Sequence, residues 1–354
     1  MSNKFKAGDL VEVRPAGEIL ATLDEEGSLE NLPFMPEMLP YVGKRFRVSR
    51  RAHKTCDTVH QTGGRWLGNC VHLEDLRCDG DGHDGCKASC LLFWKTAWLR
   101  PVPAGSALDG STPGGSVEEL TALRSLVSKG TKRNDARSED IVYRCQATAL
   151  YDASRPLAWY DVRQYAEDLT SGNTGLRHML RVWFFNGLRK LMGLGVGYGL
   201  SVRVYDFFQR RIGGYENPFR SGSIPEGEKT PARQLDLVPG EKVRIRSHQE
   251  ILATLNRANK NRGMYFDVEM VPYCGKTYTV RRRVDRIIHE TTGRMIEIKT
   301  PSVILDGVVC RSEMSSCRLF CPRAIPSYWR EIWLERVGAE DASPTPDRSP
   351  QAPG

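Results

Sequence analysis

The chain has 354 residues, of which 40% are hydrophobic and 27% are charged, and its formal net charge is +8. This composition excludes a wholly disordered chain, and the length suggests two or three folded domains. The positive charge favours acidic partners such as nucleic acid, anionic lipid or anionic glycans.

No apolar secretory leader follows Met1, so we expect a cytoplasmic protein in which the ten cysteines stay reduced. In a reducing compartment, cysteines are expected to act as metal ligands or buried thiols rather than to form disulfides. Their spacing is therefore the main guide to function.

The first predicted elements are strands at 9–14 and 44–48, separated by a short helix at 18–23. Polar and apolar residues alternate in both strands, as expected when one face of a strand is buried. The same series returns near the other end of the chain, because residues 8–51 align without gaps on 240–283. The second copy also predicts a further strand at 293–299.

The two copies share identical sequence as well as pattern. Residues 18–23 have the same sequence as residues 250–255. Two tryptophan pairs recur near the ends of the copies: Trp94 with Trp98, and Trp329 with Trp333. The match implies duplication of a unit of about 95 residues, the size of one small domain. We expect the tryptophans to pack the preceding cysteine loops onto each domain, with an aromatic recognition surface as the alternative.

Short alternating strands with turn glycines favour an SH3-like small barrel for each copy. The expected fold class is α+β, with two homologous SH3-like β-barrel domains that carry cysteine metal loops, separated by a helical middle segment. The expected boundaries are repeat 1 at 1–103, a linker at 104–115, the helical middle at 116–212, a linker at 213–239, repeat 2 at 240–338 and a disordered tail at 339–354.

The middle segment is predicted to hold helices at 116–128 and 158–169, and a long helix from Leu176 onward. Ser116 is a plausible N-cap, with acidic residues in the first turn after it. Residues 176–212 are apolar but interrupted by arginine and lysine, and no charge-free stretch is long enough to cross a bilayer. We expect an amphipathic helix packed on the protein, with peripheral membrane contact as the alternative.

Each copy contains a triplet of cysteines. In the first copy the spacing is Cys-x7-Cys-x3-Cys, at Cys78, Cys86 and Cys90. In the second copy it is Cys-x6-Cys-x3-Cys, at Cys310, Cys317 and Cys321. A second alignment, on the flanking Ser, Leu and Phe residues, pairs Cys90 with Cys317 and leaves Cys321 unmatched.

Three neighbouring thiolates suit one soft metal ion, and Zn²⁺ takes four Cys or His ligands. We expect Cys56 to be the fourth ligand in the first copy. The position equivalent to Cys56 falls beside His289, which is the expected fourth ligand in the second copy. An iron–sulfur cluster on the same thiolates, or buried and redox-active thiols, are the alternatives. His83 lies within the first triplet and is either a further metal ligand or a loop residue.

The sharpest basic run comprises Arg281, Arg282, Arg283 and Arg286, with Arg50 and Arg51 as a smaller counterpart. Such a run is typical of a solvated strand face, and a nucleic-acid-binding surface is the alternative.

Several strings resemble a family of bacterial proteins with tandem cysteine-rich SH3-like domains. They are residues 32–38, 53–57, 78–80, 143–148, 163–165, 270–275 and 328–333. The resemblance covers both copies and the middle, and it implies a gene near clusters for polysaccharide or specialised-metabolite synthesis. It implies no activity.

These observations favour a cytoplasmic metal-binding scaffold or accessory protein with two zinc sites and a protein partner. The chain shows no acid–base pair, nucleophile triad or phosphate loop. The alternative is a metalloenzyme whose site, with Cys56 and His83, lies in the first copy, because that copy has more His and Asp near its cysteines.

Overall fold

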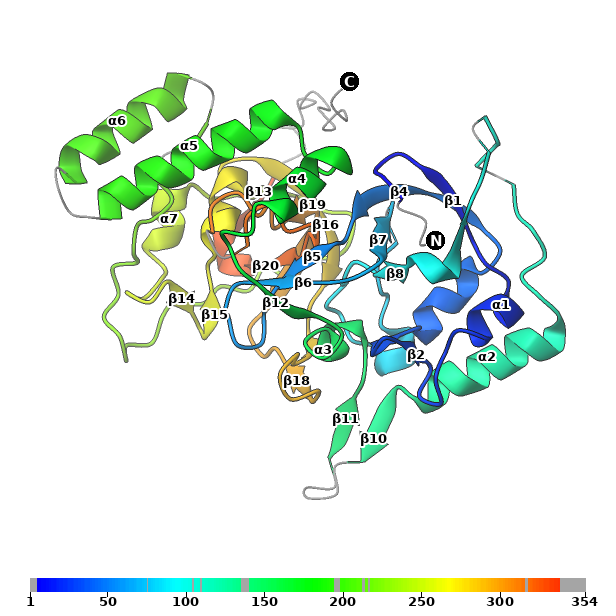
Figure 1. Cartoon of the computed structure of the whole chain (residues 1–354). Coiled ribbons are helices and arrows are strands. Elements are labelled where there is room, and N and C mark those ends of the chain that lie inside the picture. The colour runs from blue at the N-terminus through cyan, green and yellow to red at the C-terminus, as the bar shows by residue number, and fades with distance from the viewer. Residues whose placement is uncertain are drawn as a thin grey trace. The chain divides into compact units, whose positions relative to one another are not determined.

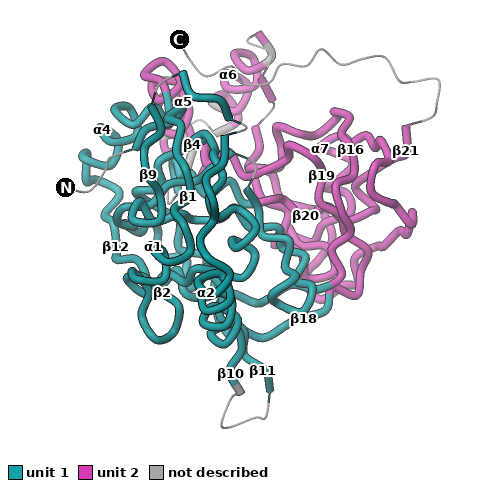
Figure 2. Tube along the Cα trace, turned by 90° about the vertical axis from the view of Figure 1, so that its right-hand side faces the viewer, with its two compact units in different colours: residues 1–174, 286–297, 317–325 teal, residues 175–285, 298–316, 326–354 magenta. Residues whose placement is uncertain are grey.

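The computed structural model describes residues 5–74, 76–103, 105–108, 110–134, 140–193, 198–211, 214–215, 217–315 and 318–337 (Figure 1). The fold is mixed α and β, as expected. Its elements form two compact units, and each unit draws on several stretches of the chain (Figure 2). Unit 1 lies within 1–174, 286–297 and 317–325, and unit 2 within 175–285, 298–316 and 326–354. Within the described residues, no helix combines the length and the apolarity that crossing a bilayer requires.

Unit 1 is built on a five-stranded antiparallel sheet in the order β8-β7-β4-β1-β9. The strands are β1 (Leu10–Val13), β4 (Arg45–Arg51), β7 (Cys70–Leu73), β8 (Trp94–Lys95) and β9 (Leu99–Pro101). Val11 pairs with Phe46, and Val71 pairs with Trp94. A bulge interrupts the β4–β7 register between Val48 and Arg50.

Unit 2 is built on a second five-stranded sheet, in the corresponding order β20-β19-β16-β13-β21. The strands are β13 (Lys242–Ile245), β16 (Thr277–Arg283), β19 (Ser302–Val309), β20 (Pro326–Arg330) and β21 (Leu334–Arg336). Val243 pairs with Tyr278, and Val303 pairs with Trp329. The bulge recurs between Val280 and Arg282. The two copies therefore agree in strand order, register and irregularity.

The tryptophan pairs lie in the cores of the two sheets, where they are fully buried. In unit 1 the ring of Phe34 meets Trp98 edge-on, with 5.2 Å between centroids, and in unit 2 Phe266 meets Trp333 at 5.3 Å. Trp98 Nε1 donates to Thr22 Oγ1, and Trp333 makes the same bond to Thr254. The second tryptophan of each pair thus has a partner for its indole N–H, whereas the buried Nε1 atoms of Trp94 and Trp329 have no hydrogen-bond partner among the described residues.

The other elements of unit 1 are helices and short strands that form smaller, separate sheets. Its helices are α1 (Ala16–Leu20), α2 (Val117–Lys129), α3 (Gln146–Ala149), α4 (Arg163–Thr170) and a 3₁₀ helix at Pro36–Tyr41. Its remaining strands are β2 (Ser28–Leu29), β3 (Leu32–Pro33), β5 (Lys54–Cys56), β6 (Gly64–Trp66), β10 (Lys132–Asn134), β11 (Ile141–Tyr143), β12 (Arg155–Leu157), β17 (Arg286–Ile288) and β18 (Met295–Glu297). Ser116 caps α2 in a capping box with Glu119, as predicted.

Unit 2 contains the long helices. They are α5 (Leu176–Gly193) and α6 (Tyr198–Arg211), and shorter elements are α7 (His248–Leu252), β14 (Lys260–Asn261), β15 (Met264–Tyr265) and a 3₁₀ helix at Val268–Tyr273. The single helix expected from Leu176 is therefore two helices. The middle predicted as helical at 116–212 also contains the short strands β10, β11 and β12. The predicted tail at 339–354 falls outside the described residues.

A buried histidine makes unit 1 sensitive to acid. The Nδ1–H of His72, on β7, donates to the carbonyl of Leu92 at 2.9 Å, and the ring packs on Phe93. Burial lowers the pKa of His72 to about 3, despite this hydrogen bond. The unfolded chain, with a pKa of about 6.5, takes up the proton first. Stability that is complete above pH 6.5 is therefore lost progressively as the pH falls toward 3.

The second copy supplies the variant that tests this effect. The register places Ile304 where the first copy has His72. Between pH 7 and pH 5, the parent protein should lose about 2 kcal/mol more unfolding free energy than the His72→Ile variant, when both are measured in EDTA. Urea titrations at the two pH values measure this difference. An unchanged pH dependence would show that His72 is protonated in the folded state.

Candidate functional site

The first cysteine triplet lies on a closed loop of unit 1. The N–H of Cys78 donates to the carbonyl of Cys90 at 2.8 Å. Beside this bond, Arg77 and Leu91 form an antiparallel β-bridge. Gly80, at a φ of +85°, lets the loop fold back on itself, because a Cβ there would lie 2.0 Å from the carbonyl oxygen of Cys86. The two ends of the loop are therefore joined by backbone hydrogen bonding, and within the loop the backbone of Gly80 lies close to that of Cys86.

His83 anchors this loop to the 3₁₀ helix at Pro36–Tyr41. Its Nδ1 lies 2.6 Å from Glu37 Oε1, and its Nε2 lies 3.2 Å from the carbonyl oxygen of Arg144. Burial alone would lower the pKa of His83, but the hydrogen bond and charge of Glu37 outweigh it and raise this pKa. Both ring nitrogens are thus used in holding the loop, as the interpretation of His83 as a loop residue implies.

Four thiols lie within electrostatic range of one another around the loop, and one of them was not expected. Burial raises the pKa of Cys78, and the nearby Glu37, Cys90 and Cys145 raise it further. Burial likewise raises the pKa of Cys90 to about 12, with Cys145 and Cys86 adding to the effect. The pKa of Cys145 rises to about 11 through burial and the charge of Cys86. Each of the four cysteines therefore lies within electrostatic range of others in the group, which we call the thiol cluster (Cys78, Cys86, Cys90 and Cys145).

The cluster is not a ready-made metal site. Among the described residues, no three Cys, His, Asp or Glu side chains stand in an arrangement that could hold a metal ion. The nine cysteines that the structure describes are all free of disulfide bonds. As it stands, the cluster is a group of thiols of which Cys86 is buried and the other three are partly buried.

The hairpin of the second copy packs against the first cysteine loop. Strands β17 and β18 are the counterpart of β5 and β6, yet they belong to unit 1. The N–H of Lys87 donates to the carbonyl of Arg286 at 2.9 Å, and the N–H of Ile288 donates to Cys86 Sγ at 3.4 Å. A thiol of the cluster is thereby fixed by backbone from the other copy.

The β5–β6 hairpin of the first copy in turn contacts part of the second copy's cysteine loop. Cys56, at the end of β5, is hydrogen-bonded through its thiol to Cys321, and this contact, together with burial, raises the pKa of Cys56. The neighbouring Arg323 reaches Glu290 Oε1 at 2.7 Å and Thr58 Oγ1 at 3.0 Å. In unit 1, then, each copy's hairpin contacts the cysteine loop of the other copy.

The ligands expected for the second site are therefore divided between the two units. Cys310 belongs to unit 2, where its Sγ lies 3.5 Å from Ser312 Oγ, whereas Cys321 belongs to unit 1. His289 is exposed in the turn of the β17–β18 hairpin, with Nδ1 3.0 Å from Thr292 Oγ1. Cys317 lies outside the described residues.

The strand register also corrects the alignment of the triplets. Arg77 pairs with Leu91 in the first copy, and Val309 pairs with Pro326 in the second. Cys78 therefore corresponds to Cys310, as predicted, but Cys90 corresponds to Ile325. Neither sequence alignment, of Cys90 with Cys321 or with Cys317, is kept in the structure.

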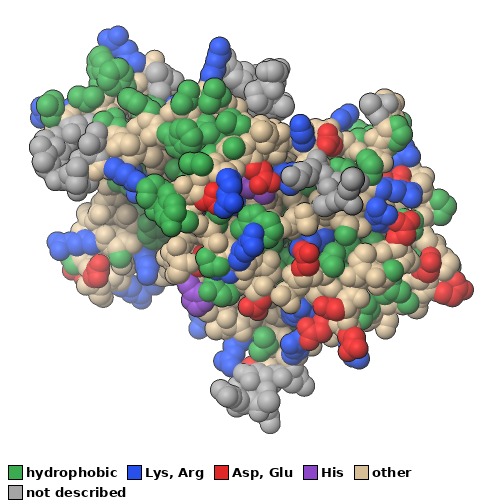
Figure 3. Space-filling model, in the orientation of Figure 1, with side chains coloured by type: hydrophobic (Ala, Val, Ile, Leu, Met, Phe, Trp, Pro, Cys, Tyr) green, Lys and Arg blue, Asp and Glu red, His purple; other side chains and the backbone are tan. Residues whose placement is uncertain are grey.

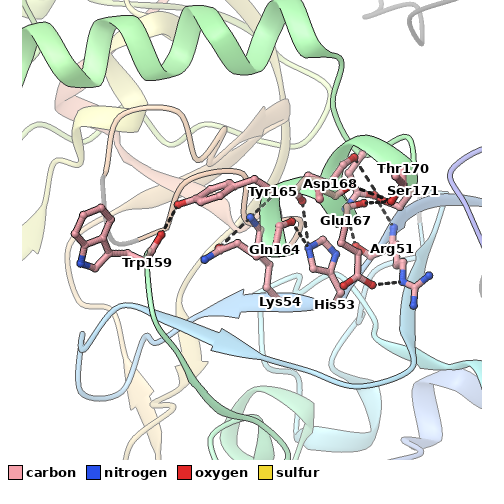
Figure 4. A network of polar contacts seen from close by, with 12 residues as sticks. Arg51, His53, Lys54, Trp159, Gln164, Tyr165, Glu167, Asp168, Thr170 and Ser171 are labelled. Carbon is pink, nitrogen blue, oxygen red and sulfur yellow. Dashed lines mark hydrogen bonds and ion pairs between the residues drawn. The ribbon is translucent and has the colours of Figure 1, made fainter. Parts of the chain in front are cut away.

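A second cluster of functional side chains lies on β5 and α4 of the same unit (Figure 4). Residues 53–57 are all buried, although four of the five are polar or charged. Lys54 Nζ lies 2.6 Å from Asp168 Oδ2, above the rings of Tyr165 and Phe320. His53 Nε2 lies 3.4 Å from Asp168 Oδ1 and 3.2 Å from the carbonyl oxygen of Gln164. Figure 4 shows the lysine and imidazole reaching from one element toward the other.

Burial sets the protonation of this network. It raises the pKa of Asp168 to about 6, against the opposing effect of Lys54, and it lowers the pKa of His53 to about 4. A pocket of about 560 Å³ adjoins the network and is lined by His53 and Gln164, among others. One wall is Trp66, with the guanidinium of Arg155 stacked 4.0 Å from its ring centroid. The pocket therefore offers a flat cationic surface beside a neutral imidazole.

Sequence reasoning missed Cys145, Lys54 and Asp168 as site residues. Cys145 lies far along the chain from the triplet, so spacing does not connect it with the other three thiols. The signal for the second cluster was present in the run His-Lys-Thr-Cys-Asp at 53–57, where a strand carries polar residues on both faces. On α4, the four-residue spacing of Gln164 and Asp168 places two buried polar side chains on one face.

The basic run that suggested nucleic-acid binding is partly used inside the protein. Arg283 donates to the carbonyl of Leu237 and pairs with the buried Glu331 at 3.3 Å. In unit 1, Arg51 pairs with Glu167 at 2.8 Å. Nucleic-acid binding stays a prediction.

Comparisons of the chain with protein-family models, with curated proteins and with solved structures gave no match.

Proposed function

We propose that this protein is a zinc-binding scaffold in which the thiol cluster of unit 1 holds one ion. The observation that carries the proposal is the proximity of Cys78, Cys86, Cys90 and Cys145: Cys90 and Cys145 raise the pKa of Cys78, Cys145 and Cys86 raise that of Cys90, and Cys86 raises that of Cys145. Four sulfurs are the complete ligand set of a closed structural zinc site. Rotation about χ1 moves a sulfur between staggered positions without moving the backbone, so the cluster can close on an ion.

The ion would reverse the protonation of the cluster. Burial and neighbouring groups keep the pKa values of Cys78, Cys90 and Cys145 high, but a bound cation removes the proton from each coordinating sulfur. The loop from Cys78 to Cys90 contains one short 3₁₀ turn as its regular structure. A bound metal ion that cross-links this loop would therefore supply much of the loop's stability, as metal ions do in other small domains. An iron–sulfur cluster on the same four thiolates is the alternative ligand.

The proposal assigns one site to the chain, where the sequence predicted two. Of the second set, Cys310 and Cys321 belong to different units, and His289 is engaged in its own hairpin turn. Cys56 faces Cys321 and is left outside the site. The proposal retains the rest of the prediction: each five-stranded sheet is a small SH3-like barrel, and the barrels present surfaces to a protein partner in the cytoplasm of a bacterium, within a biosynthetic pathway.

The test is metal content of the full chain purified without oxygen. We expect about one Zn²⁺ per chain and a colourless solution. Cys145→Ser should remove most of the zinc. The matched control is Cys70→Ser, because Cys70 is buried on β7 away from the cluster and the register places Ser302 at its position in the second copy.

Two outcomes would contradict the proposed site. If Cys56→Ser lost the metal while Cys145→Ser kept it, the ligand set expected from sequence would be correct instead. A brown protein with acid-labile sulfide would replace zinc with an iron–sulfur cluster and favour the metalloenzyme.

A further inference from the structure

Two helices of unit 2 carry exposed apolar stripes at the same spacing. On α5 the stripe consists of Leu176, Leu180, Trp183 and Phe184. On α6 it consists of Leu200, Val204, Phe207 and Phe208. Both follow the pattern i, i+4, i+7, i+8, which places all four side chains on one face of a helix. The eight side chains are between 38% and 69% exposed.

These stripes are not the faces by which the helices pack in unit 2. A neighbouring face of α5 buries Met179 and Val182, and on that face Asn186 Nδ2 donates to the carbonyl of Glu313 at 2.7 Å. Between the helices, the rings of Phe185 and Tyr205 meet with 5.5 Å between centroids. Each helix thus has one face that holds it in place and a second, apolar face that the described residues of the unit leave 38% to 69% exposed.

The charge around the stripes is almost wholly positive. The described basic residues of the two helices are Arg177, Arg181, Arg189, Lys190, Arg203 and Arg211. The one acidic residue among their described positions is Asp206, which is buried and accepts a hydrogen bond from the N–H of Asn217 at 2.7 Å. Figure 3 shows hydrophobic side chains gathered over the two helices at the upper left, with lysine and arginine among them.

We propose that α5 and α6 together bind the surface of an anionic lipid bilayer. Amphipathic helices of this kind lie in the plane of the interface, with large apolar side chains among the acyl chains and cations at the headgroups. Tryptophan and phenylalanine suit that position because they add large apolar area at the boundary. A second copy of the chain is the less favoured occupant, because it would bring the same positive charge to the same patch.

The experiment uses the full chain and sedimentation with two kinds of vesicle. Vesicles of phosphatidylcholine with phosphatidylglycerol should bind the protein, and raising the salt concentration should weaken this binding. Vesicles of phosphatidylcholine alone should bind it at least about tenfold more weakly. The test variant is the double substitution Phe184→Glu and Phe207→Glu, which changes two exposed side chains and leaves the packing faces intact. It should lower the partition coefficient for anionic vesicles about a hundredfold.

The matched control is Val117→Glu, which removes an exposed apolar side chain at the first turn of α2 in unit 1. It should bind vesicles as the parent protein does, and circular dichroism should show the same helix content in all three proteins. Failure to bind anionic vesicles overturns the proposal, as does binding that the double substitution leaves unchanged. A dimer that the double substitution dissociates, without vesicle binding, would assign the patch to a second copy. These readouts are independent of metal content.

Discussion

Replacing Lys54 with methionine should destabilise unit 1 by about 3–5 kcal/mol. The side chain is buried against Asp168, with 2.6 Å between Nζ and Oδ2. Methionine has similar length but no charge, so Asp168 would remain buried without its cation. Because a buried charge without a partner costs much more than the pair contributes, the single substitution should have a large effect. Hydrogen exchange of the β5 and β6 amides, which reports on unit 1 by itself, measures the change.

Two further variants separate this explanation from a loss of packing. The double variant Lys54→Met with Asp168→Leu removes both charges, and it should recover most of the lost stability. Arg163→Ala breaks the exposed pair with Asp161, at 2.7 Å, and should leave stability almost unchanged, because water already screens that pair. If the double variant were as unstable as Lys54→Met, the loss would come from the shape of the site and not from an unpaired charge.

The duplicated sheets could be predicted from the sequence because their pattern is local. Residues 8–51 and 240–283 keep the same alternation, the same turn glycines and the same helix. Such features depend on residues close together in the chain, and the structure gives both copies the same strand order and bulge. The role of the tryptophans in packing followed from their recurrence.

The strands of the middle segment gave weaker signals. The strand β12 contains Pro156, which argues against a strand in the interior of a sheet. The structure places β12 at the edge of the order β12-β6-β5, where proline is tolerated. The helix predicted at 158–169 begins at Arg163, because Asp161 accepts a hydrogen bond from the N–H of Arg163 and fixes the preceding turn.

The thiol cluster could be predicted only in part. The closeness of Cys78, Cys86 and Cys90 follows from a short loop, which spacing reveals. The approach of Cys145, and the pairing of Cys56 with Cys321, depend on contacts between segments that are distant in the chain. The exchange of hairpins between copies has no periodic signature, because each hairpin looks the same in sequence whichever loop it contacts.

Replacing Glu269 with alanine should release the loop at 313–315 and destabilise unit 2 by about 3 kcal/mol or more. The carboxylate is buried, and it accepts hydrogen bonds from the N–H groups of Glu313, Met314 and Ser315 at 3.2, 2.8 and 3.2 Å. The register of the two copies matches it with Glu37, which binds His83 instead. The same buried acid therefore anchors the segment after the equivalent cysteine in both copies, through backbone in one and a side chain in the other.

Hydrogen exchange at the three amides is the measurement, because it reports the loss of each bond directly. The matched control is Glu250→Ala in the same unit, since Glu250 also accepts from a backbone N–H, that of Ser247 at 2.9 Å, but is exposed. That variant should cost about 1 kcal/mol and leave the loop protected. Equal exchange in both variants would mean that the loop is held by other contacts.

The effect of Glu269→Ala should reach beyond the loop to α5. Asn186 of α5 donates to the carbonyl of Glu313, and Arg189 donates to the carbonyl of Met314. These bonds fix the helix only while the loop keeps its conformation, so amides of α5 should lose protection together with those of the loop. Exchange that rises in the loop while α5 stays protected would show that Met179 and Val182 alone hold the helix in place.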